Sequence, residues 1–192
     1  LPNHIVKGHN SMRKNEWIKK ELKRTELYGK TLGILGLGRI GLELAKRAMS
    51  FGMKVIAYDP FVVENDDVQM NNQLTEVLNK ADFVSLHMPL TEDTEGIVDQ
   101  ELLKEFKSGA FLINTGRGKT IVEEDISKAL ISGKLAGYGT DVWYSDPPVD
   151  SPLINAPNVL MLPHLGASTK ENLVRIGEII CSIINKFTQS EF

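Results

Sequence analysis

The sequence has little of several features that would mark a specialised class of protein. Its 192 residues contain a single cysteine, Cys181, so no disulfide can form within the chain, and we expect this residue in the core of a protein from a reducing compartment. No apolar run approaches the roughly 20 residues needed to cross a bilayer, and no charged-then-apolar leader opens the chain. These absences favour a cytoplasmic protein.

Neither sign of charge is in large excess. The 22 basic and 25 acidic residues give a net charge of -3, which offers no electrostatic reason to expect nucleic acid or a membrane surface as a partner. With 42% hydrophobic and 24% charged residues, the composition is that of an ordinary globular domain with one substantial core. We therefore expect a small molecule as the partner, and we predict no metal site.

Short apolar runs alternate with helical patterns through the middle of the chain. Strands are predicted at 31–35, 54–59, 83–87, 110–114, 135–140 and 159–162, and helices at 40–51, 74–80, 99–106 and 123–132. Such alternation is typical of βαβ units with a parallel sheet. We predict an α/β fold, a Rossmann doubly wound parallel sheet, with the proline-rich stretch after Asp146 as a loop between the fifth and sixth strands.

Helical patterns also flank this region. At 11–24 the residues Trp17, Ile18 and Leu22 recur at helical spacing among lysines and arginines, which we interpret as a solvated helix face rather than an anion site. Residues 168–187 form a long helical pattern with an apolar stripe, which requires a partner surface. Trp17 and Trp143 are most simply packing residues.

A glycine motif lies between the first predicted strand and the first predicted helix. Gly36 permits a tight turn, Gly38 has no side chain to block a pyrophosphate, and Gly41 lets the helix pack closely on the sheet. The backbone amides of Arg39 and Ile40 at the helix start are placed to meet phosphate oxygens, helped by the helix dipole. The motif predicts a dinucleotide site, although glycines of this kind also serve as a purely structural turn.

Asp59 ends the second predicted strand. Its carboxylate would accept hydrogen bonds from the adenosine ribose hydroxyls, and a 2'-phosphate there would meet a like charge. The sequence therefore favours NAD over NADP. The alternative is that Asp59 is an ordinary turn residue before Pro60.

Further polar clusters follow later predicted strands, at the edge where open α/β sheets bind ligands. They are His87-Met88-Pro89-Leu90-Thr91, Asn114-Thr115-Gly116-Arg117-Gly118, Asp141-Val142-Trp143 and Pro163-His164-Leu165-Gly166-Ala167-Ser168-Thr169. In this order and spacing the clusters resemble the D-2-hydroxyacid dehydrogenase family, which includes phosphoglycerate, D-lactate and formate dehydrogenases. The resemblance spans about residues 27–187.

The resemblance implies three catalytic residues. Arg117 would hold the substrate carboxylate, because a guanidinium fork matches a carboxylate and stays charged, and His164 would be the acid/base. Asp146 stands where the family usually has a glutamate that pairs with the histidine, so the charge is kept but the reach is shorter by one methylene. We expect Asp146 to pair with His164. Otherwise Asp146 is a turn residue and His164 works without a close carboxylate. Independently of this pairing, the structural alternatives are a core or loop histidine for His164 and a helix-start or surface arginine for Arg117.

The resemblance also implies NAD as the cofactor. Asp141 matches the residue that receives the nicotinamide carboxamide, and Thr115, Gly116 and His87 would line the nicotinamide end. For His87, a structural role at the end of its strand is equally open. The predicted cofactor set is completed by Pro89, His164, Gly166 and Ala167.

In the resembling family, the Rossmann domain is inserted into a second domain, and the substrate binds between the two. We therefore interpret residues 1–26 as a connecting helix from an absent substrate domain, 27–167 as the NAD-binding domain and 168–192 as a return helix. The isolated chain is expected to bind NAD but to turn over poorly, because it would lack a cleft wall to exclude water.

The implied function is hydride transfer between NAD and a D-2-hydroxy acid. The stretch from His164 to Glu171 resembles phosphoglycerate dehydrogenases most, so we expect oxidation of D-3-phosphoglycerate to 3-phosphohydroxypyruvate, a step of serine biosynthesis, by a homodimer. A glyoxylate or hydroxypyruvate reductase is the alternative. An alternative from a different functional class is an NAD-sensing, co-repressor-like binding protein. Partner binding that depends on NADH, without turnover, would identify such a protein.

Overall fold

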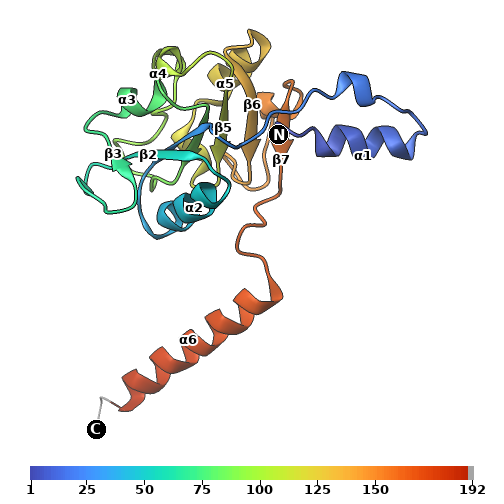
Figure 1. The fold of residues 1–192 in the computed structure, drawn as a ribbon. Coiled ribbons are helices and arrows are strands. Elements are labelled where there is room, and N and C mark those ends of the chain that lie inside the picture. Colours follow the sequence, from blue (N-terminus) through green and yellow to red (C-terminus); the bar gives the residue numbers. More distant parts are fainter. Residues whose placement is uncertain (190–192) are drawn as a thin grey trace.

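The computed structural model describes residues 1–189 and contains a seven-stranded sheet in which every neighbouring pair is parallel (Figure 1). The strands are β1 (Thr31–Leu35), β2 (Lys54–Tyr58), β3 (Gln69–Met70), β4 (Phe83–Leu86), β5 (Ala110–Asn114), β6 (Leu135–Thr140) and β7 (Val159–Met161). Their order across the sheet is β3-β2-β1-β4-β5-β6-β7, which confirms the predicted doubly wound α/β fold. The edge strand β3 was not predicted, because two residues are too short to show a period.

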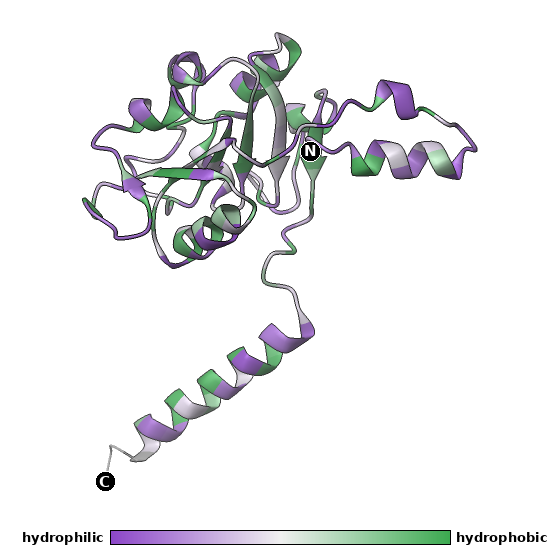
Figure 2. Cartoon of the chain, viewed as in Figure 1, coloured by the Kyte–Doolittle hydropathy of each residue, from purple (hydrophilic) through white to green (hydrophobic). Residues whose placement is uncertain are grey.

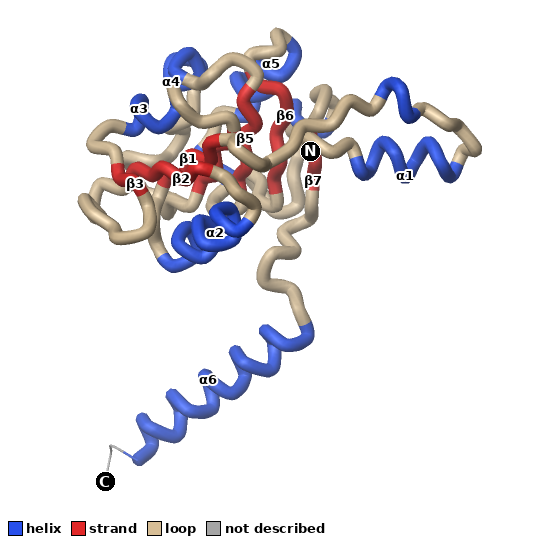
Figure 3. Tube along the Cα trace, in the orientation of Figure 1, coloured by secondary structure: helices blue, strands red, loops and turns tan. Residues whose placement is uncertain are grey.

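Helices cover the sheet on both faces (Figure 3). Helix α2 (Arg39–Ser50) packs on one face, and α3 (Leu74–Leu78), α4 (Gln100–Glu105) and α5 (Glu123–Ile131) pack on the other. Local chemistry sets their ends: Gly52, with φ +73°, follows the last turn of α2, and the Asp99 side chain caps α4 by accepting a hydrogen bond from Leu102 N at 2.8 Å.

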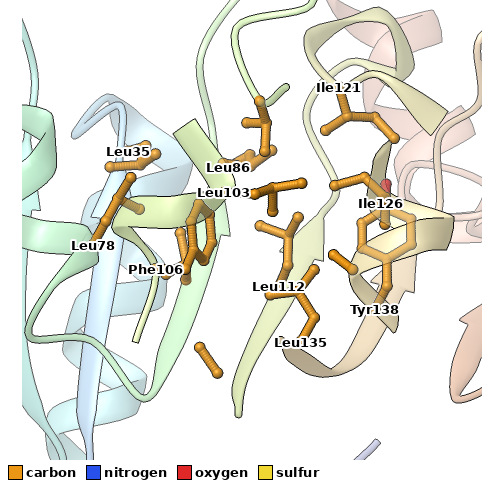
Figure 4. Packing of buried hydrophobic residues seen from close by; sticks show 14 of the residues in the cluster. Leu35, Leu78, Leu86, Leu103, Phe106, Leu112, Ile121, Ile126, Leu135 and Tyr138 are labelled. Atoms are coloured by element: carbon orange, nitrogen blue, oxygen red, sulfur yellow. The ribbon is translucent and has the colours of Figure 1, made fainter. Parts of the chain in front are cut away.

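Two apolar clusters form the core, one on each face of the sheet. The larger cluster joins β4, β5 and β6 to α3, α4 and α5, with Leu112, Ile126 and Tyr138 fully buried (Figure 4). The smaller cluster joins β1 and β2 to α2 through residues such as Ile34 and Ala45. Because both faces are covered, these strands carry near-continuous apolar runs, as Figure 2 shows.

The N-terminal segment differs from the predicted single helix over 11–24. The structure has α1 (Ile5–Arg13), then an irregular turn, then the short η1 (Lys19–Glu21). Asn15 adopts φ +58°, and its amide and that of Glu16 bond back to Met12 and Ser11, which ends the helix in a left-handed turn that asparagine tolerates. Trp17 is 77% exposed, so the prediction that it is a packing residue is wrong for the described chain.

Helix α6 (Lys170–Gln189) extends away from the sheet (Figure 1). Its apolar stripe is exposed, as is Cys181, so the prediction that this cysteine lies in the core is wrong. The predicted helix over 168–187 is confirmed, but the burial of its apolar stripe depends on whether another surface covers it. No helix in the described part of the chain is both long and apolar enough to cross a membrane.

The chain reverses its winding direction between β1 and β4. From β1 it proceeds outward to β2 and β3, and from β4 it proceeds the other way to β5, β6 and β7. In a doubly wound sheet, the crevice outside the carboxyl ends of the strands at this point is the ligand site. Every predicted site residue lies in a segment that follows one of these carboxyl ends.

Candidate active site

The glycine turn after β1 has the geometry that its residues predict. Gly36 has φ +94°, and a Cβ there would lie 2.8 Å from the His87 carbonyl carbon. A Cβ on Gly41 would lie 2.5 Å from the Gly36 oxygen, so this glycine lets α2 approach the turn. A Cβ on Gly38 would meet nothing within 4 Å, which leaves open space beside the start of the helix.

Helix α2 begins at this open space. Gly38 provides no side-chain cap, and the first residues, Arg39 and Ile40, are exposed. Uncapped amides at the start of a helix, together with the positive end of its dipole, bind anions such as a pyrophosphate. The arrangement therefore fits the phosphate end of a dinucleotide.

Asp59, directly after β2, is held beside the same turn. Its Oδ2 accepts a hydrogen bond from Leu37 N at 2.8 Å, and its Oδ1 accepts one from Phe61 N at 2.8 Å. Asp59 is half-buried, and each carboxylate oxygen has a second lone pair for a further donor. The carboxylate is thus oriented to accept from hydroxyl groups at the edge of the sheet, as the ribose of a dinucleotide would require.

His87 follows β4 and turns toward its own strand. Its Nε2 lies 2.9 Å from the hydroxyl oxygen of Ser85, which the twofold period of a strand places on the same side. Burial lowers the pKa of His87, so the neutral ring is favoured. Next to it, the Pro89 carbonyl accepts a hydrogen bond from Thr94 Oγ1 at 2.6 Å, which anchors the following loop.

The loop after β5 presents Arg117. Thr115 and Arg117 are exposed, and Arg117 Nη1 donates to the Gly116 oxygen at 2.8 Å. A Cβ on Gly116 would lie 3.1 Å from the Leu86 oxygen, so this loop packs against the end of β4. The rest of the guanidinium is available to an anionic ligand in the described chain.

Asp141 joins the end of β6 to the segment after β7. Its buried carboxylate accepts hydrogen bonds from Leu165 N at 2.7 Å and from Gly166 N at 2.6 Å. The Ala167 oxygen then accepts a bond from Asn172 Nδ2 at 2.8 Å, which ties this segment to the start of α6. The Asp141 carboxylate therefore holds the backbone immediately after His164 in place.

His164 and Asp146 form a pair. His164 Nδ1 lies 2.5 Å from Asp146 Oδ2, and the two side chains are 55% and 50% exposed. Trp143 is buried, as predicted, and its Nε1 donates to the Leu162 oxygen at 3.0 Å, which draws the two loops together. Beside the pair is a hollow of about 410 Å³ lined by Trp143, Asp146, Pro147, Pro148, Met161, Leu162, Pro163 and His164.

The structure thus brings together most of the residues that the sequence singled out. Direct contacts link the turn at Gly36 to His87, and Asp141 to the segment after His164. Across residues 1–189, no hydrogen bond joins Arg117 to Asp146 or His164, and no group of His, Cys, Asp or Glu side chains is arranged to hold a metal ion. Sequence reasoning missed Ser85. Its position two residues before His87, on the same side of an extended strand, could have predicted the contact.

Comparison with known proteins shows which family and which proteins this chain resembles. The model of the D-isomer specific 2-hydroxyacid dehydrogenase NAD binding domain matches residues 1–166. The chain is 45% identical over 177 residues to a hydroxypyruvate reductase of Thermotoga maritima, covering 91% of this chain and 58% of that protein. It is 41% identical over 192 residues to a D-3-phosphoglycerate dehydrogenase of Methanocaldococcus jannaschii, covering 98% and 37%.

A solved structure is similar over the whole chain. The NAD-dependent formate dehydrogenase from Staphylococcus aureus in complex with NAD has a TM-score of 0.91 and 32% identity, and the match covers 100% of this chain and 59% of that one. The chain therefore spans 37% to 58% of the length of the two curated relatives described above.

Proposed function

The chain belongs to the D-isomer specific 2-hydroxyacid dehydrogenase family, and from this premise we propose that the protein transfers a hydride between NAD and a D-2-hydroxy acid or its 2-keto acid. NAD is the cofactor of the family's domain, and the glycine turn, the uncapped start of α2 and Asp59 fit it. The observation that carries the proposal is the Asp146–His164 pair, at the same edge of the sheet as the dinucleotide turn.

The side chains divide the chemistry between them. Arg117 binds the substrate carboxylate through its free guanidinium N–H groups, which fixes the carbon that reacts. Because Asp146 holds Nδ1 of His164, Nε2 is the atom that donates a proton to the keto oxygen in reduction and removes it from the hydroxyl in oxidation. The glycine turn, the start of α2 and Asp59 would hold the dinucleotide, which would supply the hydride donor for reduction and the hydride acceptor for oxidation.

The substrate that we rank first is D-3-phosphoglycerate, oxidised to 3-phosphohydroxypyruvate. Similarity to a phosphoglycerate dehydrogenase over 98% of this chain supports it. Hydroxypyruvate is the second candidate, favoured by the 45% identity to a hydroxypyruvate reductase. Assays of the full-length protein with both compounds, following NADH absorbance, distinguish them by their kcat/KM values. NADH binding without turnover of any 2-hydroxy or 2-keto acid would contradict the enzymatic proposal.

Cofactor binding is tested on this chain by calorimetric titration with NADH and, separately, NADPH. We expect saturable NADH binding, poorer NADPH binding, and a loss of about 1–3 kcal/mol of NADH binding free energy in Asp59→Ala, because an acceptor of two ribose hydroxyls is removed. Asp66→Ala is the matched control, since it removes an exposed acidic side chain from the same loop. Unchanged NADH binding in Asp59→Ala would exclude Asp59 from the site.

The domain roles and partners complete the proposal. We propose residues 27–167 as the NAD-binding domain and the flanking segments as connections to a substrate domain, supported by the greater length of the relatives. The exposed stripe of α6 supports contact with a further surface, in another domain or in a second copy of a homodimer. A cytoplasmic location remains a prediction.

A further inference from the structure

The backbone of Arg117 is held by a concentration of hydrogen bonds. Its carbonyl oxygen accepts from Thr120 Oγ1 at 2.7 Å, from Asn114 Nδ2 at 3.0 Å and from Thr120 N at 3.2 Å. Asn114 Oδ1 accepts from Gly116 N at 3.0 Å, one residue earlier. Two side chains therefore hold the loop on both sides of the arginine Cα.

These two side chains are inaccessible to water. Asn114 is 0% exposed and Thr120 is 1% exposed, so neither can exchange its loop partner for solvent. Asn114 Nδ2 also donates to Thr120 Oγ1 at 3.4 Å, which makes the contacts one network. A buried network of this kind is rigid, because breaking any bond leaves a desolvated polar atom without a partner.

Steric contact blocks the remaining freedom of the loop. A Cβ on Gly118 would lie 1.8 Å from the Trp143 oxygen, so the chain after Arg117 is pressed against the loop that leads to Asp146. The Arg117 side chain, by contrast, is exposed. A fixed backbone beneath an exposed guanidinium is what precise placement of a substrate carboxylate requires.

Asn114 also connects the arginine to the other half of the site. Its backbone oxygen accepts from Asp141 N at 3.1 Å, and Asp141 holds the backbone after His164 through Leu165 N and Gly166 N. The buried Asn114, at the end of β5, therefore holds the arginine loop directly and the segment after His164 through Asp141.

We propose that Asn114 and Thr120 are positioning residues that set the place of Arg117 for the 2-keto acid. This proposal rests on the proposed function. The Thr120 hydroxyl gives the sharper test, because Thr120→Val keeps the shape of the side chain and removes the hydroxyl that donates to the Arg117 oxygen and accepts from Asn114 Nδ2. Thr120→Ser keeps that donor and is the rescue variant.

The experiment compares the full-length wild-type protein with Thr120→Val, Thr120→Ser and Ser151→Ala. Ser151 is the matched control, since its hydroxyl is also buried but accepts from Leu153 N, away from Arg117. With hydroxypyruvate and 3-phosphohydroxypyruvate as probes, we expect kcat/KM to fall roughly 10- to 100-fold in Thr120→Val through a raised KM, with the Kd for NADH unchanged. Thr120→Ser and Ser151→Ala should stay near the wild-type values.

A second readout separates failure of this proposal from failure of the proposed function. Amide hydrogen exchange at Gly116 and Thr120, whose N–H groups donate to Asn114 Oδ1 and to the Arg117 oxygen within this network, should accelerate at least about tenfold in Thr120→Val and not in Ser151→Ala, whether or not the protein turns over. Exchange rates in Thr120→Val that equal those of the wild type would overturn the positioning role. So would a loss of NADH binding in Thr120→Val as large as its loss of turnover, or a loss of activity in Ser151→Ala as large as that in Thr120→Val. If the wild-type protein shows no turnover but exchange is still faster in Thr120→Val, the enzymatic function is overturned and the positioning role is not.

Discussion

Asp146 has a side chain one methylene shorter than a glutamate, yet its Oδ2 lies 2.5 Å from His164 Nδ1. The backbone supplies the missing reach: Trp143 Nε1 bonds to the Leu162 oxygen, and His164 itself adopts φ +55°. A left-handed conformation costs free energy in a residue other than glycine, and the two hydrogen bonds that the following amides donate to the Asp141 carboxylate offset it. Single side chains at this site are thus placed by contacts between loops.

Tyr138 gives a prediction at the same scale. Its hydroxyl is buried and makes no hydrogen bond of good geometry among the described residues. Burial raises its pKa to about 12 and outweighs the opposite effect of the nearby Thr140 and Asn114 side chains. Removing a desolvated hydroxyl costs little, so Tyr138→Phe should be neutral or stabilising by about 1 kcal/mol at pH 8 in urea unfolding. Destabilisation by more than about 1 kcal/mol would mean that the hydroxyl has a partner.

The alkaline pH dependence of the same variant follows from the raised pKa. The unfolded chain loses the phenol proton near pH 10, whereas the folded chain keeps it until about pH 12, so this group's contribution to stability is lost as the pH rises through that window. Between pH 8 and pH 11, wild type should therefore lose more stability than Tyr138→Phe. The exposed Tyr144, changed to Phe, is the control and should behave like wild type.

At the scale of elements, Asp82 joins the starts of three strands. It lies just before β4; its Oδ2 accepts from Thr31 N at 2.9 Å and its Oδ1 from Lys107 Nζ at 2.6 Å. Its backbone oxygen accepts from Phe111 N. Burial acts to raise the pKa of Asp82, but the bonds from Lys107 and Thr31 outweigh it and hold the pKa below its usual value. Through its carboxylate and its backbone oxygen, Asp82 therefore links β1, β4 and β5 at the amino ends of these strands, opposite the site.

Asp82→Asn should lower the free energy of unfolding by about 1–3 kcal/mol at pH 7, because the amide cannot accept at both positions. A lowered pKa contributes stability above the unfolded value of about 3.9, and that contribution is lost as the pH falls through the folded value. The difference from wild type should therefore shrink in urea unfolding at pH 3. Asp93→Asn, an exposed change, is the control. An equal difference at both pH values would contradict the charge-based account.

At the scale of the whole molecule, the structure divides into a packed α/β body and a projecting helix. The side chains of α6 from Leu173 to Thr188 are exposed, including the apolar stripe of Leu173, Ile176, Ile179, Ile180, Ile183 and Ile184. Figure 2 shows the helix extending away from the body. In this chain the helix therefore contributes little to the stability of the sheet.

Ending the chain at Thr169 should leave the Tm of the α/β body within about 2 °C of its original value, because no core contact is lost. Amide exchange along 170–189 should be much faster than in β5 and β6. Leu112→Ala is the positive control: this side chain is fully buried between β4, β6 and the helices, and its loss should cost about 2–5 kcal/mol. A fall of many degrees on truncation would show that α6 packs on the body in solution.

Local patterns in the sequence determined much of the molecule. The alternation of apolar runs predicted six of the strands and the doubly wound sheet, and the spacing of Gly36, Gly38 and Gly41 predicted the turn, because both depend on interactions between residues close along the chain. The roles proposed for Arg117 and His164 came from a resemblance to a family.

Only the tertiary structure decided which separate segments meet. The pairing of Asp146 with His164 crosses 18 residues, and the bonds from Asp141 to Leu165 and Gly166 cross 24 and 25, so both depend on the order of β6 and β7 in the sheet. The same holds for exposure: the patterns of Trp17 and Cys181 suggested burial, but burial requires a surface to pack against, and none in the described chain covers them. A period along the chain specifies which face of an element is apolar, whereas its partner is set by the fold.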